Sequence, residues 1–145
     1  MTRTLLVAIQ VAALLGLAVT ARADDDEKLA ATLKAVVESN LRAYDGEDAA
    51  GTMGTIHTRS PQYDTTNAAL AEQFRDFDLS TKVTNFRYMG HDDEFVVARV
   101  KTRLVAPPGS GFEDNVVDSL VAFHQEGGVG KVWSDEVLGV EFVAK

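Results

Sequence analysis

The stretch EFVVARVKTRLVA, at residues 94–106, decides the fold of this chain. Its apolar and charged side chains alternate, and a period of two is typical of a strand with one face on a core and the other toward water. Arg99, Lys101 and Arg103 share the charged face. We expect these cations either to bind an anion or to pair with acids on neighbouring strands, such as Asp118.

The same period of two continues on both sides of this stretch. Residues 83–89 form a predicted strand before it, and residues 115–125 and 131–143 form two more after it. Short turns rich in glycine and proline separate these strands. Successive strands joined by short turns pair antiparallel, so the sequence predicts a four-stranded antiparallel sheet.

Helices precede the strands. Apolar side chains recur every three or four positions over residues 26–44, which predicts an amphipathic helix that ends near Gly46. A second, weaker helix is predicted over residues 47–56, where two glycines lower the helix propensity. A third helix is expected to start near Thr66 or Asn67, both good capping residues. Helices followed by strands, without alternation between them, predict an α+β domain.

The N-terminus has the features of a secretory signal peptide. Arg3 supplies a positive charge, residues 5–19 are largely apolar, and Ala21-Arg22-Ala23 provides the small residues of a cleavage site. The apolar run is shorter than the roughly 20 residues that a membrane span needs. We therefore expect residues 1–23 to be removed. Residues 24–145 would then form one exported domain, periplasmic or extracellular, without membrane contact.

Composition narrows the range of functions. The 145 residues carry a formal charge of −8, and 46% of them are apolar and 25% charged, as in globular proteins. The negative charge argues against nucleic acid as the main partner, because phosphate binding needs a basic surface. The absence of cysteine excludes disulfides, thiolate catalysis and Cys-ligated zinc. No metal site and no cofactor are expected.

Three short motifs lie where the predicted elements meet. They are AYDGEDAA at residues 43–50, IHTRSPQY at residues 56–63 and Lys131-Val132-Trp133. In this order they resemble the nuclear transport factor 2-like superfamily, in its SnoaL-like and ketosteroid isomerase-like branches, and the chain looks like a secreted member. The resemblance covers nearly all of residues 27–143. It implies a cone-shaped roll, with N-terminal helices packed on a curved antiparallel sheet and a pocket at the open end.

The sequence does not clearly show the catalytic pattern of the superfamily's enzymes, so two functions remain open. One is a non-catalytic ligand-binding or accessory domain with an apolar pocket for a small hydrophobic molecule. The other is a small acid–base enzyme, an isomerase, dehydratase or cyclase, acting on such a molecule. The pocket candidates are Tyr44, His57, Tyr63, Asp118 and Trp133. Convergence of two or more of the ionisable candidates in one pocket would favour the enzyme.

The last two predicted strands are apolar on both of their alternating faces. Each apolar face of a sheet must pack against other protein atoms, and the predicted helices can pack against only one of the two faces. We expect a second copy of the chain to cover the other, in a homodimer that uses the outer face of the sheet. Leu120, Val137 and Val143 are the residues expected at this contact. A barrel-like curl of the sheet is the alternative cover.

Overall fold

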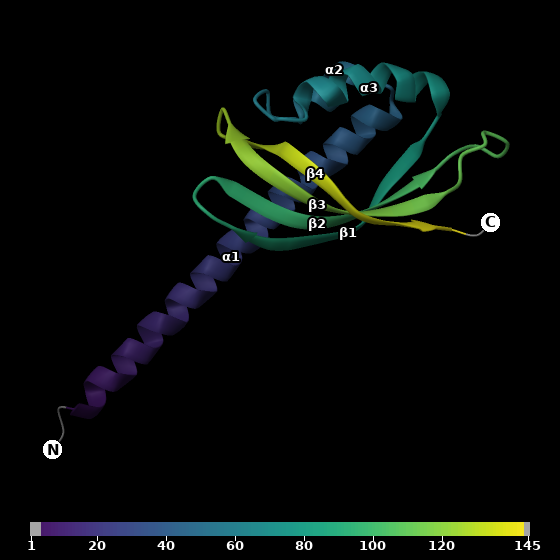
Figure 1. The fold of residues 1–145 in the computed structure, drawn as a ribbon. Coiled ribbons are helices and arrows are strands. Elements are labelled where there is room, and N and C mark those ends of the chain that lie inside the picture. The colour runs from purple at the N-terminus through teal and green to yellow at the C-terminus, as the bar shows by residue number, and fades with distance from the viewer. Residues whose placement is uncertain (1–3, 144–145) are drawn as a thin grey trace.

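Three helices are followed by four strands, as Figure 1 shows. The computed structural model describes the backbone of residues 4–143 and the side chains of residues 22–143. The elements are α1 (Thr4–Asp45), α2 (Ala49–Gly54), α3 (Tyr63–Asp76), β1 (Ser80–His91), β2 (Phe95–Val105), β3 (Asn115–Glu126) and β4 (Val129–Phe142). The predicted α+β class, with N-terminal helices on an antiparallel sheet, is confirmed.

The helices differ from their predicted bounds in length. α1 begins at Thr4, so the residues predicted to form a signal peptide belong to the same helix as the domain's first amphipathic turns. α3 begins at Tyr63, before the predicted caps, with Gln62 as its N-cap. Figure 1 shows the N-terminal half of α1 extending beyond the sheet. In the part of the chain that the structure describes, no helix is long and apolar enough to cross a membrane.

α2 is shorter than predicted, and its first turn explains the position of one glycine. The side chain of Asp48 caps the helix by accepting a hydrogen bond from the backbone N–H of Gly51, at 2.8 Å. A Cβ atom at Gly51 would lie only 2.3 Å from a carboxylate oxygen of Asp48. The cap therefore requires glycine there, because any side chain would displace the carboxylate.

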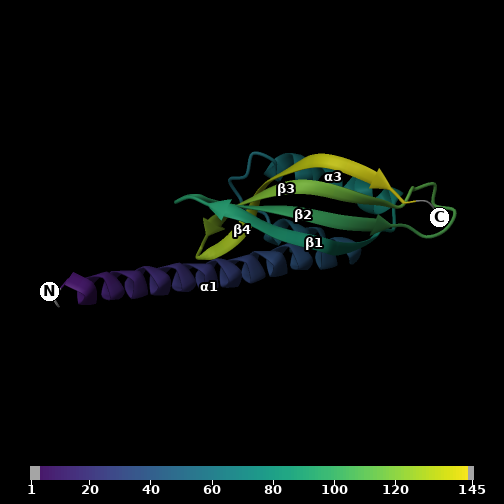
Figure 2. The same ribbon diagram turned by 90° about the horizontal axis from the view of Figure 1, so that it is seen from below.

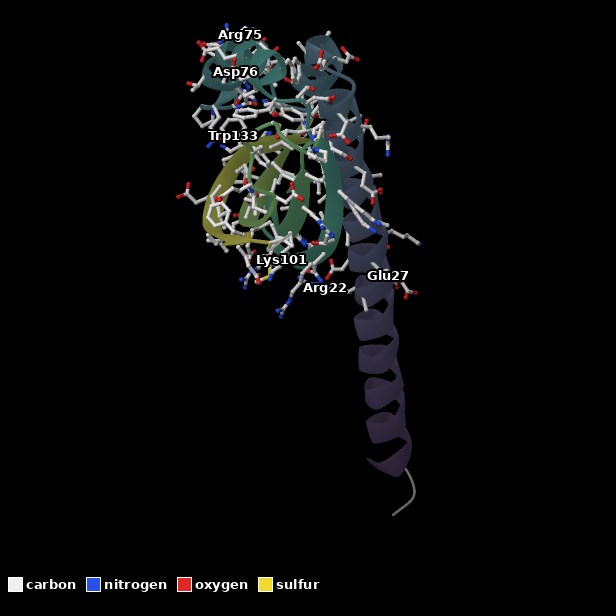
Figure 3. All side chains as sticks on the ribbon, turned by 90° about the vertical axis from the view of Figure 1, so that its right-hand side faces the viewer. Arg22, Glu27, Arg75, Asp76, Lys101 and Trp133 are labelled. Atoms are coloured by element: carbon white, nitrogen blue, oxygen red, sulfur yellow. The ribbon has the colours of Figure 1, made fainter. Side chains whose placement is uncertain are left out.

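The four strands lie in chain order, β1-β2-β3-β4, and every neighbouring pair is antiparallel. One face, here called the inner face, packs against the helices, where Leu33 and Val37 of α1 meet Val100, Val121 and Phe123. The opposite face is here called the outer face. In Figure 2 it is turned toward the viewer, and α3 lies behind the sheet. Figure 3 shows Lys101 on the side of the sheet away from α3, which carries Arg75 and Asp76.

Two bulges in β4 overturn the simple alternation expected for that strand. Trp133 falls between the partners of Ala122 and Phe123, and Leu138 falls between the partners of Asp118 and Ser119, so both are extra residues in the pairing. After each extra residue, the side chains that follow point to the opposite face from the one that strict alternation predicts. Asp135 and Val137 therefore lie on the inner face, across from Val121 and Ser119. The prediction that Val137 lies on the outer face is wrong.

The core forms two adjoining clusters. The first lies between α1 and the sheet, and the second joins Met53 and Ile56 to Leu70 of α3, with Phe74 packed against them. Leu33, Leu41 and Val100 belong to the first cluster, and Phe74 belongs to the second. Trp133, the extra residue of the first bulge, packs among the rings of His57, Phe95 and His124.

The segment between α2 and α3 covers the first half of the edge strand β4. The N–H of His57 donates to the carbonyl of Val132 at 2.8 Å, and the N–H of Val132 donates to the carbonyl of Thr55 at 2.9 Å. Ser60 donates its hydroxyl to the carbonyl of Trp133. These bonds satisfy backbone groups that an open sheet edge would leave to water. They also hold the wall of a cavity in place.

Candidate functional site

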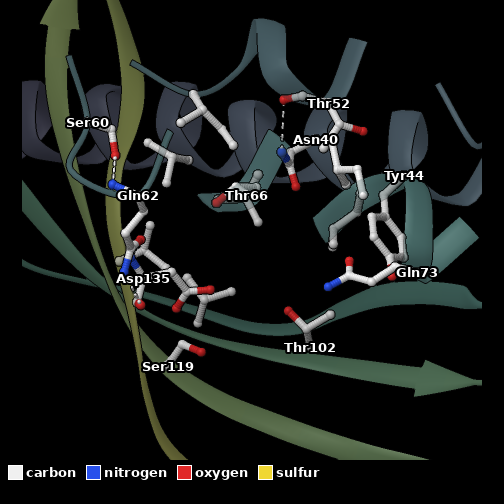
Figure 4. Close-up of a pocket in the computed structure, with 17 residues that line it drawn as sticks. Asn40, Tyr44, Thr52, Ser60, Gln62, Thr66, Gln73, Thr102, Ser119 and Asp135 are labelled. Carbon is white, nitrogen blue, oxygen red and sulfur yellow. Dashed lines mark hydrogen bonds between the residues drawn. The ribbon is translucent and has the colours of Figure 1, made fainter. Parts of the chain in front are cut away.

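A cavity of about 210 Å³ lies between the three helices and the inner face of the sheet. Figure 4 shows its polar side chains, which come from all three helices, the segment before α3 and strands β2–β4. Its lining residues are Val37, Asn40, Leu41, Tyr44, Thr52, Ile56, Ser60, Gln62, Thr66, Leu70, Gln73, Val100, Thr102, Ser119, Val121, Val132 and Asp135. This is the concave, largely apolar type of site that small molecules occupy.

The charge content of this lining is low. Among the residues that the structure describes, the lining contains no lysine, arginine or histidine, and Asp135 is its one carboxylate. Its remaining polar groups are hydroxyls and amides, which donate and accept hydrogen bonds without carrying charge. Such a lining suits a neutral molecule with one or two hydrogen-bonding groups. The described residues contain no cluster of three or more acidic or histidine side chains able to hold a metal ion.

Asp135 is held in position through its backbone. The amide of Gln62 donates to the carbonyl of Asp135 at 3.2 Å and accepts from its N–H at 3.0 Å. This reciprocal pair replaces the neighbouring strand that the edge of β4 lacks. Because Trp133 is an extra residue in the pairing, the side chain of Asp135 faces the cavity rather than the outer face.

The carboxyl group of Asp135 has a shifted pKa. Burial raises its pKa above the ordinary value, a hydrogen bond from Ser119 acts in the opposite direction, and the charge of Glu136 raises it further. The residue as a whole keeps considerable solvent exposure. The raised pKa and the solvent exposure are compatible, because a concave wall admits water while surrounding the carboxylate with protein atoms. The site therefore favours the protonated acid more than free solution does.

Tyr44 and Asn40 present polar groups from α1. The ring of Tyr44 packs edge-on against Phe74, with centroids 5.3 Å apart. Burial, followed by the charge of Asp45, raises the pKa of its hydroxyl, so the phenol remains a neutral hydrogen-bonding group. The amide nitrogen of Asn40 donates to the hydroxyl of Thr55 at 2.7 Å and to the carbonyl of Thr52 at 3.3 Å. Figure 4 shows the amide oxygen of Asn40 pointing the other way, into the cavity.

Of the five side chains expected at a pocket, Tyr44 lines this cavity and the other four lie elsewhere. His57 is 1% exposed and packs against Trp133 and His124, with ring centroids 5.0 and 4.9 Å away. Its Nδ1 accepts a hydrogen bond from the N–H of Arg59 at 3.0 Å. His57 and Trp133 therefore come together in a packed aromatic cluster, separate from the cavity lining.

Tyr63 and Asp118 also lie apart from the cavity lining. Tyr63 packs against the cluster formed by Met53, Ile56 and Leu70. Asp118 lies on the outer face, where its carboxylate accepts two hydrogen bonds from Arg99, at 2.8 and 2.6 Å, and lies 3.8 Å from Lys101. The guanidinium of Arg99 lowers the pKa of Asp118. The expected pairing of the β2 cations with an acid on a neighbouring strand is thus confirmed.

Sequence reasoning left Asp135 and the amides of Asn40, Gln62 and Gln73 out of the site. Strict alternation puts Asp135 on the same face as Trp133. Because Trp133 is an extra residue in the pairing, Asp135 lies on the inner face instead. One signal was present in the sequence. Asn40 is a polar residue at a position of the predicted helix that otherwise carries apolar side chains. A polar side chain on a buried helix face needs a partner, which indicates a polar site.

Comparison with known proteins identifies the family. Residues 35–143 match the family model described as the C-terminal domain of the anti-sigma-I factor RsgI9. The chain belongs to the RsgI9 C-terminal domain family. The match covers α2, α3, all four strands and the C-terminal part of α1 from residue 35, so it covers the whole cavity of this RsgI9-type domain. No curated protein matches the chain.

Solved structures with the same fold include both an enzyme and proteins of unknown function. Rv3472 of Mycobacterium tuberculosis, of unknown function, has a TM-score of 0.70 at 10% identity, over 79% of this chain and 73% of that chain. An NTF-2 like protein of unknown function from Shewanella oneidensis MR-1 has a TM-score of 0.58 at 9% identity, over 73% and 95%. A type 2 hexachlorocyclohexane dehydrochlorinase, LinA, has a TM-score of 0.53 at 12% identity, over 83% and 93%.

A further similar structure belongs to a longer protein. Bd1075 of Bdellovibrio bacteriovorus has a TM-score of 0.60 at 11% identity over 78% of this chain, and the match spans 40% of that protein. Identities this low establish a shared fold and nothing finer. They show that the RsgI9-type domain has the nuclear transport factor 2-like fold. They do not choose between a binding domain and an enzyme.

Proposed function

We propose that this domain binds a small, largely apolar, neutral molecule in the cavity between its helices and its sheet, without converting it. The observation that carries the proposal is the lining: apolar walls, several neutral hydrogen-bonding groups and one carboxylate. Among the ionisable candidates that would have favoured an enzyme, Tyr44 alone lies there. A binding role also suits a family named after the C-terminal domain of an anti-sigma factor, because a regulator acts by binding.

The proposed place of action is outside the cytoplasm. The support is the sequence of the first 23 residues, with a positive charge, an apolar run and small residues before an acidic segment. A domain without cysteine needs no disulfide chemistry in either the periplasm or the extracellular medium. The ligand would accordingly be a molecule of that compartment or of the surroundings of the cell.

Binding is tested with 2-naphthol, a small bicyclic aromatic with one hydroxyl group. Thr66 lines the cavity from α3, whereas its neighbour Thr65 is exposed. We expect calorimetric titration to show one site per chain, weakened at least about tenfold by Thr66→Phe, because the added ring occupies the cavity. Thr65→Phe adds the same ring outside the cavity and should leave binding unchanged. Absence of saturable binding, or equal binding by Thr66→Phe, would count against the proposal.

One observation favours a second candidate, an acid–base enzyme. Asp135 faces the cavity with a raised pKa, and a carboxylate tuned in this way is a plausible general base toward a carbon acid. Cyclohexanone in deuterated buffer tests this role, since a base in the cavity would exchange its α-protons. Exchange that wild-type protein accelerates and Asp135→Asn does not would establish the enzyme. We expect no acceleration from either protein.

A further inference from the structure

His57 and His124 form a pair of titratable side chains within the aromatic cluster beside β4. Nε2 of His57 lies 3.2 Å from Nδ1 of His124, and the two rings meet edge to face. The side chain of His57 is buried, and the rings of Trp133 and Phe95 pack around the pair. Neither histidine lines the cavity, so the proposed binding role leaves the pair without a function.

The hydrogen bonds of the pair determine where its protons lie. A neutral imidazole has one N–H donor and one acceptor nitrogen. Nδ1 of His57 accepts a hydrogen bond from the backbone N–H of Arg59 at 3.0 Å, so the proton of His57 is on Nε2. This N–H points at Nδ1 of His124, which is therefore the acceptor. In the neutral state, one hydrogen bond from His57 to His124 joins the two rings.

A second proton on His124 is incompatible with this hydrogen bond. Both ring nitrogens of a charged histidine are donors, so Nδ1 of His124 would become a donor that faces the N–H of His57. The carbonyl of Gln125, 3.0 Å from the same Nδ1, can accept the new N–H. The half-buried ring of His124 can therefore take up a proton, whereas the buried N–H of His57 loses its acceptor.

The charged residues beside the pair leave this conflict in place. Oε1 of Glu126 lies 3.7 Å from Nδ1 of His57, beyond hydrogen-bonding distance, and it already accepts from the N–H and hydroxyl of Thr58. The ammonium of Lys131 lies 3.0 Å from the other carboxylate oxygen of Glu126. Arg59 meets the pair through its backbone N–H, and β2 contributes an aromatic ring. None of these groups supplies a new acceptor for the Nε2–H of His57.

The covering segment, residues 55–62, connects the pair to the cavity. The N–H of His57 donates to the carbonyl of Val132 at 2.8 Å, and the carbonyl of His57 accepts from the N–H of Ser60 at 2.9 Å. Ile56, Ser60 and Val132 line the cavity. The residue that loses its hydrogen-bond acceptor in acid is therefore part of the backbone that forms a cavity wall.

We propose that the two histidines make the cavity sensitive to pH. Protonation of His124 breaks the hydrogen bond between the rings, loosens the covering segment and so weakens ligand binding. Histidine ordinarily changes its charge between pH 5 and 8, so the change occurs in mild acid. Only the last step, weaker binding, rests on the proposed function. The loosening of the segment belongs to the protein alone and is measured without a ligand.

Hydrogen–deuterium exchange of the covering segment, corrected for the intrinsic pH dependence of exchange, tests the loosening. From about pH 7.5 to about pH 5.5 we expect exchange in the wild type to become at least about fivefold faster. His124→Asn keeps an acceptor oxygen for the N–H of His57 and does not titrate, so its exchange should stay constant. The matched control, His91→Asn, removes a histidine at the end of β1 and should behave like the wild type.

The proton positions are tested on the wild type itself. Nitrogen-15 NMR of the imidazoles at about pH 7.5 should show His57 with its proton on Nε2. A proton on Nδ1 of His57 would overturn the proposal, whether or not His124→Asn folds. So would exchange of the covering segment that is unchanged in acid in the wild type, or that still accelerates in a folded His124→Asn protein.

Titration with 2-naphthol tests the last step. The Asp135→Asn protein is used, because Asp135 lines the cavity and itself titrates, whereas Glu126, with a pKa of about 2, stays ionised in mild acid. We expect binding at least about threefold weaker at about pH 5.5 than at about pH 7.5. Saturable binding of equal affinity at both pH values would overturn the link to the cavity. Faster exchange in acid without any binding of 2-naphthol would support the histidine switch and contradict the proposed function.

Discussion

At the scale of single residues, Glu126 anchors the segment that covers the edge of β4. Its carboxylate accepts hydrogen bonds from the N–H and hydroxyl of Thr58 and lies 3.0 Å from the ammonium of Lys131. The hydrogen bond from the Thr58 hydroxyl, followed by that from Lys131, lowers the pKa of Glu126 to about 2. The ionised form is therefore the one that the fold stabilises.

This anchor predicts a pH dependence of stability. Because the folded-state pKa lies below the ordinary value of 4.5, the contribution of Glu126 is complete above pH 4.5 and is lost as the pH falls toward about 2. Glu126→Gln should lower the melting temperature at pH 7 and show a smaller further loss between pH 4.5 and 2 than the wild type. Thermal melts at fixed ionic strength measure this. Parallel pH profiles for the two proteins would contradict it.

Ionisation of Asp135 affects the stability of the fold in the opposite direction from ionisation of Glu126. Its folded-state pKa is raised above the ordinary value of 3.8, so its ionisation costs stability, and this cost develops as the pH rises through the folded-state value. Asp135→Asn removes the charge and should raise the melting temperature at pH 7, with the gain disappearing as both forms become neutral in acid. Ser119 stays in place as the hydrogen-bonding neighbour in both proteins. A variant that melts below the wild type at pH 7 would show that the carboxylate is structurally required.

At the scale of elements, α1 approaches the sheet closely at Gly130 on β4. A Cβ atom there would lie 2.7 Å from Cδ2 of Leu33, whose side chain is 1% exposed and held in the core. Gly130→Ala should therefore cost about 1–3 kcal/mol of unfolding free energy, the usual range for overpacking a filled core. Gly139→Ala, on the same strand with no atom near its Cβ, is the control and should cost little.

Denaturant unfolding of a double variant separates packing from backbone effects at Gly130. Leu33→Ala alone should cost about 2–5 kcal/mol, because it leaves a cavity under β4. Adding Gly130→Ala to Leu33→Ala should then cost less than it does in the wild type, since the methyl group enters space that Leu33 vacated. Equal costs in both backgrounds would mean that the strand backbone, rather than contact with Leu33, requires glycine.

The elements were predictable from sequence, whereas the faces of β4 were not. Periodicity is a local property, so the alternation in residues 94–106 was enough to place β2, and short turns fixed antiparallel pairing. A bulge depends on what the extra residue packs against. Trp133 leaves the pairing and joins His57 and His124 in an aromatic cluster, and this contact between distant segments turns Asp135 into the cavity. A local pattern contains no information on such a contact.

At the scale of the whole molecule, α1 consists of a part that packs on the domain and a part that extends beyond it. The first described contact with the sheet is at Asp26, whose carboxylate lies 3.3 Å from the hydroxyl of Tyr88 and 3.7 Å from His91. Figure 3 shows Arg22 and Glu27 where α1 leaves the sheet. Removal of residues 1–23 would take away the charge of Arg22, which acts on Tyr88, and would leave the hydrogen bond between Tyr88 and Asp26 in place.

Cleavage between Ala23 and Asp24 would also improve the remaining helix. Residues 24–27 are all acidic and lie in the interior of α1 in the uncut chain, where the helix dipole does not favour negative charge. After cleavage they become the first turn, where the dipole stabilises acidic side chains by about 0.3–1 kcal/mol each at low salt. We predict that the exported protein has the intact mass of residues 24–145 and melts no lower than the full chain. Recovery of the uncut chain from the membrane fraction, or a lower melting temperature for residues 24–145, would show that the N-terminal half of α1 belongs to the functional protein.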